Sequence, residues 1–172
     1  MDDESDPAES NSPAEPLRVD ISSEIETCST ETDLLSRAIR MTASEYSADR
    51  GTISVAIVND EQMHELNRRY LNHDYTTDVL SFAYDQGEDW IEGELVICKD
   101  FAKRSAIAFG WTPESELALY AIHGTLHLMG LDDHSDTDRR QMRLAERELL
   151  TQLGIDGAQR HGYDDLEGAD VQ

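Results

Sequence analysis

The chain has 172 residues, of which 38% are hydrophobic and 30% are charged, a composition that suits one globular domain with polar extensions. No apolar run approaches the roughly 20 residues that a membrane-spanning helix needs. Cys28 and Cys98 are too few and too far apart for a disulfide scaffold or a cysteine-based zinc site. The first residues are acidic where a secretory signal would be basic and then apolar, so we expect a cytoplasmic protein.

The formal net charge of −23 is unusual for a protein that meets nucleic acid. Residues 1–16 contain six acidic residues and no Lys or Arg, and residues 156–172 contain five acidic residues and one Arg, which leaves about −13 between them. Because this field repels phosphate, any contact with RNA has to depend on a local basic patch or on a metal ion.

Both ends of the chain are predicted to be tails around one domain. Residues 1–16 combine Asp, Glu, Ser, Asn and Pro without apolar periodicity, so we expect a disordered acidic tail. Residues 156–172 are rich in Gly and Asp and are predicted to be a flexible acidic tail. The folded domain is therefore expected at residues 17–155.

The first half of the domain alternates strands and helices. Residues 17–21 have period two and are predicted to be a strand. Residues 33–47 have helical apolar spacing, with Thr30 or Thr32 as a possible cap. Residues 52–58 are β-branched and alternating, which is typical of a strand. Asn59 or Asp60 then caps a short helix through Leu66 and Tyr70.

Two further strands and three helices complete the pattern. Strands are predicted at residues 78–83 and 94–98, and the Gly- and acid-containing link 85–93 indicates a hairpin. Helices are predicted at residues 101–109, 113–129 and 137–153, with Pro113 near the start of the second. The fold class is therefore α+β, with about four strands in a mixed sheet and about five helices packed against it.

Three of the six histidines fall within residues 123–134, at the end of the central apolar helix. His123 and His127 are four residues apart, so both imidazoles point the same way and can reach one metal ion. Gly130 provides a place for the helix to stop, after which Asp133 or His134 could return to the same ion. Three protein ligands and one open position are typical of catalytic zinc, whereas structural zinc usually has four protein ligands.

A pair of histidines at this spacing is often only two ordinary side chains, but its apolar surroundings favour metal binding here. Buried neutral imidazoles need partners, and one ion satisfies both. Zinc proteases with this helix carry a general-base Glu directly after the first His, and this chain has Gly124 there. A metal ion could still lower the pKa of bound water toward about 7 and polarise a phosphoryl oxygen, so hydrolysis or phosphodiester cleavage remains open.

A second polar segment spans residues 66–82. Arg68 and Arg69 are the densest basic spot in an acidic domain, with His73 close behind, and form the natural place for phosphate contact. The ordinary alternative is that these arginines are merely solvated. Thr77 and Asp78 precede a buried strand, where a turn or cap hydrogen bond would also explain them.

Together the two segments resemble the YbeY family of bacterial endoribonucleases and rRNA maturation factors. The family has a Leu-Asn…Thr-Asp-Val-Leu-Ser-Phe segment, then a Gly-Asp-Ile-like strand, then His-Gly-X-Leu-His-Leu-X-Gly-Tyr-Asp-His. This chain has Leu-Asn at 66–67, Thr-Asp-Val-Leu-Ser-Phe at 77–82, Gly-Glu-Leu-Val-Ile at 93–97 and the histidine segment at 123–134. Met142, Glu146 and Leu149-Leu150 also resemble the family's closing helix, and the resemblance covers about residues 17–155.

The resemblance implies a zinc-dependent endoribonuclease that cuts single-stranded RNA in 16S rRNA 3′-end maturation and ribosome quality control. Its cofactor would be one Zn²⁺ per chain, and its partners would be precursor rRNA and the small ribosomal subunit, not DNA or a membrane. By motif match, His123 and His127 would be the first two zinc ligands. Since imidazole is the better zinc ligand and a loop tolerates one extra residue, we favour His134 over Asp133 as the third.

One departure from the family bears on the mechanism. The family commonly has an Arg after the aromatic residue at position 70, and this chain has Leu71. If that Arg stabilises phosphate charge in relatives, Arg68, Arg69 or His73 has to take over its task. We therefore include Arg68 and Arg69 with His123 and His127 as candidate catalytic residues. The alternatives are a metal-dependent protease or amidase, and a non-catalytic ribosome-assembly factor.

Overall fold

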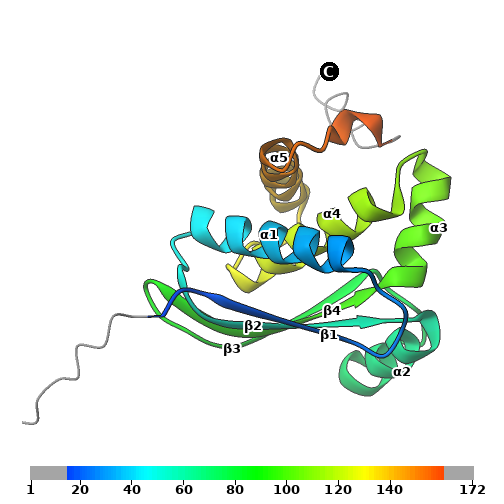
Figure 1. The fold of residues 1–172 in the computed structure, drawn as a ribbon, viewed down its shortest axis with the longest axis horizontal. Helices are drawn as coiled ribbons and strands as arrows, with labels where there is room; N and C mark the ends of the chain where they lie inside the picture. The colour runs from blue at the N-terminus through cyan, green and yellow to red at the C-terminus, as the bar shows by residue number, and fades with distance from the viewer. Residues whose placement is uncertain (1–14, 161–172) are drawn as a thin grey trace, which may run out of the picture.

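A mixed sheet with the strand order β1-β2-β4-β3 forms one layer of the molecule (Figure 1). The computed structural model describes residues 15–160, so the predicted tail segments 1–14 and 161–172 lie outside the described residues. β2 pairs in parallel with β1 and β4, and the edge strand β3 pairs antiparallel with β4. The strands are β1 (Arg18–Ser23), β2 (Arg50–Val58), β3 (Val79–Gln86) and β4 (Trp90–Cys98).

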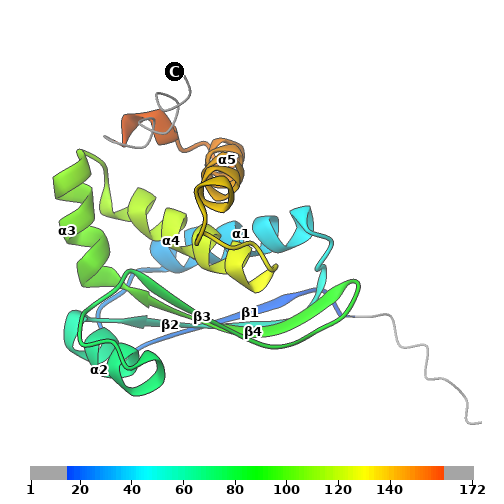
Figure 2. The same ribbon diagram turned by 180° about the vertical axis from the view of Figure 1, so that it is seen from behind.

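Helices cover both faces of this sheet, and the α+β prediction is confirmed. The helices are α1 (Ser29–Glu45), α2 (Asp60–Leu71), α3 (Lys99–Phe109), α4 (Pro113–Leu128) and α5 (Asp136–Gln152), followed by the 3-10 helix η1 (Gly157–Gln159). Figures 1 and 2 show α1 and α4 on one face, α5 beyond α4, and α2 alone on the opposite face. No helix within residues 15–160 combines the length and apolar character needed to cross a membrane.

The main core lies between the sheet and the layer of α1 and α4. Its largest fully buried side chains come from α1, the sheet, α4 and α5: Leu35, Ile39, Ile53, Ile91, Leu95, Ile97, Leu117, Ile122, Leu126, Met142 and Leu149. α4 is apolar around most of its circumference because it is surrounded by α1, α3, α5 and the sheet. A histidine on this helix is therefore partly enclosed by protein on several sides.

The apolar run in β4 is explained by burial on both faces of the strand. Leu95 and Ile97 point into the main core, whereas Val96 and Cys98 point into a smaller cluster with Met63 of α2. Burial raises the pKa of the Cys98 thiol to about 12. Cys98 is therefore a buried thiol that packs as part of this cluster, whereas Cys28 is exposed.

Several boundaries differ from prediction, most of all at the start of α1 and in the link between β3 and β4. α1 begins at Ser29 after the cap residue Cys28, so a cap at Thr30 or Thr32 was wrong. The Glu31 carboxylate accepts a hydrogen bond from the Cys28 backbone N–H at 3.0 Å, which closes the first turn earlier. The β3–β4 link is also shorter than predicted, because strand pairing continues past a bulge between Ala83 and Asp85.

The residues after α5 pack against the domain. Arg160 donates a 2.6 Å hydrogen bond from Nε to the Glu116 carboxylate, which is fully buried on α4. The Arg160 guanidinium also lies 3.8 Å from the centre of the Phe109 ring. The described part of the predicted C-terminal tail, residues 156–160, therefore contacts the α3–α4 region.

Candidate metal centre

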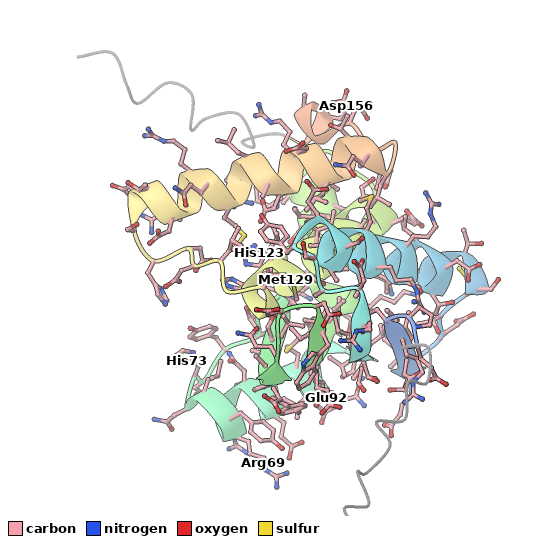
Figure 3. The ribbon with its side chains drawn as sticks, turned by 90° about the vertical axis from the view of Figure 1, so that its left-hand side faces the viewer. Arg69, His73, Glu92, His123, Met129 and Asp156 are labelled. Carbon is pink, nitrogen blue, oxygen red and sulfur yellow. The ribbon has the colours of Figure 1, made fainter. Side chains whose placement is uncertain are left out.

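His123 and His127 lie one turn apart near the end of α4, and their Nε2 atoms are 3.0 Å apart. The rings are nearly perpendicular, with an interplanar angle of 88°. Their side chains are 19% and 28% exposed, so both open toward solvent from a buried helix. Figure 3 shows His123 pointing from α4 into the space beside the loop that follows this helix.

The outer nitrogen of each ring has a hydrogen-bond acceptor. His123 Nδ1 lies 2.6 Å from Glu146 Oε1, and His127 Nδ1 lies 2.9 Å from the Leu131 carbonyl oxygen. A carbonyl and an ionised carboxylate can only accept, so both Nδ1 atoms carry the proton. Both Nε2 atoms then present lone pairs to each other across 3.0 Å, which requires a positive charge between them: a proton or a metal ion.

Asp133 is a third potential metal ligand beside the two imidazoles. Its Oδ2 atom lies 3.7 Å from His123 Nε2 and 3.6 Å from His127 Nε2, both longer than a hydrogen bond. Zinc bonds to N and O of about 2.0–2.2 Å give tetrahedral donor–donor edges of about 3.3–3.6 Å. The two separations to Asp133, 3.6 and 3.7 Å, lie at the upper end of those edges, and the 3.0 Å between the two Nε2 atoms is shorter than them. His123, His127 and Asp133 therefore form a group that could hold a metal ion.

His134, which the sequence favours as third ligand, is not brought to the two imidazoles. Its side chain is 87% exposed, and its Nε2 lies 3.3 Å from Asp132 Oδ1. Asp132, Asp133 and His134 form a second, more exposed group of potential ligands, which shares Asp133 with the first. The spacing could have indicated Asp133, since the family motif places its third histidine six residues after the second and Asp133 stands six residues after His127.

Glu146 on α5 orients the first imidazole. Its side chain is fully buried, and Arg143 donates a 2.9 Å hydrogen bond to Oε2. Burial acts to lower the pKa of His123, but the hydrogen bond and charge of Glu146, with Asp78 and Asp133, outweigh it, and the pKa lies above its ordinary value. From the sequence, Glu146 was identified only by its resemblance to the closing helix of the family. The sequence did offer a signal for Glu146, because it is an acidic residue on the apolar helix face that carries Met142, Leu149 and Leu150.

The turn after α4 positions the second imidazole. Gly130 has a φ of +94°, a conformation that favours glycine, and it reverses the chain after α4. The Leu131 N–H then donates to the Leu126 carbonyl at 3.0 Å, which fixes the Leu131 carbonyl against His127. The predicted stop at Gly130 thus brings the following acidic loop back to the two histidines.

Gly124, between the two histidines in sequence, sets the close approach of α4 to the sheet. A Cβ atom there would lie 2.9 Å from a methyl of Leu95, 2.9 Å from a methyl of Val79 and 3.1 Å from Ser81 Oγ. Ser81 also donates a 3.0 Å hydrogen bond from its hydroxyl to the Gly124 carbonyl. The start of β3 is therefore held directly against the turn of α4 that carries His123.

We expect Gly124→Ala to destabilise the protein by about 1–3 kcal/mol, because the added methyl group overpacks the contact with the sheet. Helix propensity alone predicts the opposite sign, since alanine in a helix interior is favoured over glycine by about 1 kcal/mol. Urea denaturation of both proteins measures the difference in the free energy of unfolding. A more stable variant would refute the close packing at this position.

The arginine pair lies on a different part of the molecule from the histidines. Arg68 and Arg69 end α2, which covers the opposite face of the sheet. In Figure 3 Arg69 points away from His123. Arg69 lines a surface depression with Ser22, Ala56 and Gln62, between α2 and the first two strands. The structure therefore does not bring this pair to the two imidazoles, which the sequence order could not reveal.

The loop from α2 to β3, residues 72–78, ends beside the histidines. The Thr77 hydroxyl and the Val79 N–H both donate hydrogen bonds to Asp78 Oδ1, at 3.0 and 2.8 Å. This agrees with the turn or cap hydrogen bond that the sequence offered as the ordinary explanation of Thr77 and Asp78. The charge of Asp78 also contributes to the raised pKa of His123. Asp78 is thus a further acidic group facing the candidate metal centre.

Comparisons with known proteins match the sequence to one family. The family model described as "Endoribonuclease YbeY" matches residues 19–154. A relative named Endoribonuclease YbeY from Rhodopirellula baltica is 40% identical over 134 residues, covering 77% of this chain and 68% of the relative. One of the same name from Desulfitobacterium hafniense is 35% identical, covering 70% and 82%.

A solved structure shows the same fold. The solution structure of a Thermotoga maritima protein aligns with a TM-score of 0.54 and 21% identity, covering 90% of this chain and 97% of that protein. At this identity the likeness concerns the fold alone. The match of the family model over most of the domain, together with these relatives, shows that the chain belongs to the YbeY family of hydrolytic endoribonucleases.

Proposed function

We propose that this protein is a zinc-dependent endoribonuclease that cuts single-stranded RNA, acting in the cytoplasm in 16S rRNA 3′-end maturation and ribosome quality control. Precursor rRNA and the small ribosomal subunit are its proposed partners. The observation that carries the metal-dependent part is the pair of Nε2 atoms 3.0 Å apart, each presented as an acceptor because its Nδ1 donates elsewhere. The YbeY family membership supports RNA as the substrate.

His123 and His127 are the proposed first two ligands of one zinc ion. For the third ligand, the proximity of Asp133 to both imidazoles supports the carboxylate over His134. When bound by these residues, zinc would supply Lewis acidity toward a phosphoryl oxygen and a water molecule. Glu146 holds the His123 ring in the tautomer that leaves Nε2 free to bind the ion.

The role proposed for Arg68 and Arg69 changes with their position. Because they end α2 on the opposite face of the sheet, we propose that they contact RNA phosphates outside the reaction centre. Leu71, also at the end of α2, supplies no charge there. In this proposal a bound metal ion would supply the charge that stabilises the cleaved phosphate.

Two alternatives are less well supported. A protease of the zinc-helix type needs a general base after its first histidine, and Gly124 packs against the sheet at that position. A structural zinc site is usually closed by four protein ligands, whereas His123, His127 and Asp133 are three and lie partly exposed. The first feature argues against a protease of this type, and the second favours an open catalytic centre.

The test is metal analysis of the purified protein, followed by parallel digests of a precursor 16S-type RNA and of casein. We expect near one zinc per chain, cleavage of the RNA, loss of cleavage after chelation and recovery on adding zinc. Casein should stay intact. A metal-free protein with full RNA cleavage would refute the zinc-dependent mechanism, and binding to the small subunit without cleavage under any metal would favour the assembly factor.

A further inference from the structure

The loop between α2 and β3 exposes a pair of stacked rings that the proposed chemistry does not use. The His73 and Tyr75 rings lie 5.1 Å apart between centres at an interplanar angle of 14°. The Tyr75 hydroxyl and His73 Nδ1 are 3.0 Å apart, within hydrogen-bond distance. Both residues are exposed, Tyr75 at 57%. Their outer faces are thus open to solvent although the two rings hold each other in place.

Asn67 of α2 anchors the loop that carries these rings. Its side-chain amide N–H donates a 2.7 Å hydrogen bond to the Tyr75 backbone carbonyl, and the Asn67 backbone carbonyl accepts one from the His73 N–H at 3.3 Å. Asn72 ends the helix in the left-handed conformation with a φ of 55°, which turns the chain sharply. The rings are therefore presented by a preorganised loop, which lowers the entropy cost of binding a ligand.

The same loop runs to the candidate metal centre. Its last residue, Asp78, bears electrostatically on His123, and the next, Val79, packs against Gly124. Three residues of chain span at most about 11 Å, so the Tyr75 backbone cannot lie farther than that from Asp78. In Figure 3 His73 and His123 lie on the same side of the molecule, at the β3 edge of the sheet.

A flat, open ring pair next to a phosphodiester-cleaving centre suits the face of a nucleobase. Aromatic side chains bind single-stranded nucleic acid by stacking on its bases, and this needs no positive charge. That matters in a chain of net charge −23, in which general attraction to phosphate is absent. Leu71, which precedes the loop, is exposed and uncharged, so it does not attract a phosphate group there.

We propose that the His73–Tyr75 pair is a stacking platform for an unpaired base of the RNA substrate, close to the bond that is cut. This inference rests on the proposed function and names how its substrate is held. It makes Tyr75 a substrate-positioning residue and Asn67 the residue that holds the platform. It also favours single-stranded over duplex RNA, because a paired base cannot offer its face to the rings.

The experiment uses the full-length zinc-loaded protein and a short single-stranded oligonucleotide of 2′-O-methyl nucleotides, checked on a gel to be intact afterwards. One version carries 2-aminopurine, whose fluorescence is quenched by stacking, and a matched version carries an abasic site there. Titrations give a dissociation constant for each. We expect wild type to prefer the base-containing oligonucleotide by about 5- to 150-fold and to quench its fluorescence.

Tyr75→Ala should lose both the preference and the quenching, whereas Tyr75→Phe, which keeps the ring, should retain both. Tyr84→Ala removes another exposed tyrosine, on β3, and should behave like wild type. A wild type without base preference, or a Tyr75→Ala protein that keeps it, would overturn the platform. Zinc-dependent cleavage without base preference would refute the platform alone, and base stacking without cleavage would refute the nuclease proposal alone.

Discussion

Replacing His127 by alanine is expected to remove both bound zinc and RNA cleavage. The binding free energy of a protein zinc site is on the order of 10 kcal/mol, so losing one of three ligands removes about 3 kcal/mol. That corresponds to a fall in zinc affinity of at least about 100-fold. Zinc per chain, measured by elemental analysis after dialysis, should fall from near one to near zero, with cleavage of precursor 16S-type RNA reduced at least as much.

His64→Ala is the matched control for this variant. His64 lies on α2 and contacts Asp74 at 2.8 Å, so its loss removes a histidine without touching the candidate metal centre. It should keep the wild-type zinc content. Circular dichroism and a thermal melt show whether His127→Ala is folded. A folded His127→Ala protein that still holds one zinc and cuts RNA would contradict the assignment of His127 as a ligand.

Asp133→Ala is expected to lower zinc affinity by more than about 100-fold, while His134→Ala leaves it within about twofold of wild type. The reason is geometric, because Asp133 lies 3.6–3.7 Å from both imidazole Nε2 atoms while the His134 side chain is turned out to solvent. Loss of an outer residue that only orients a ligand typically costs 10- to 100-fold, so a direct ligand should exceed that range. Competition titration with a zinc chelator measures each affinity.

A third variant separates loss of a ligand from disturbance of the loop. Asp133→His offers an imidazole at the same place and should recover most of the zinc affinity that Asp133→Ala loses. The reverse pattern, with His134→Ala losing zinc and Asp133→Ala keeping it, would show that the loop rearranges and that the third ligand is the one favoured by the sequence.

The elements of the fold followed from local patterns. Alternation predicted the strand at residues 52–58. Helical spacing predicted α4, with Pro113 near its start and Gly130 as the place where it stops. Boundaries were less accurate, as at Cys28, because a side-chain cap depends on which acceptor reaches the backbone N–H. The apolar run in β4 suggested a strand, but its burial on two faces depends on α2 packing below the sheet.

The candidate site was found only in part from the sequence. Two histidines four apart on one helix necessarily share a face, so their convergence required no tertiary information. Glu146 is 23 residues beyond His123, and only the packing of α5 on α4 brings it to the ring. The choice between Asp133 and His134 depends on which way adjacent side chains of a turn point, and spacing alone does not set that direction.

The sequence by itself determined the family, the fold class and the pair of imidazoles, because these follow from motifs and from periodicity within single elements. The tertiary structure decided what surrounds that pair. The buried Glu146 carboxylate lies against the His123 ring, and the acidic loop that carries Asp133 lies beside both rings. Arg68 and Arg69 lie on the opposite face of the sheet. These outcomes depend on how separate elements pack, and the direction of one element relative to another is not encoded in the spacing of residues within either.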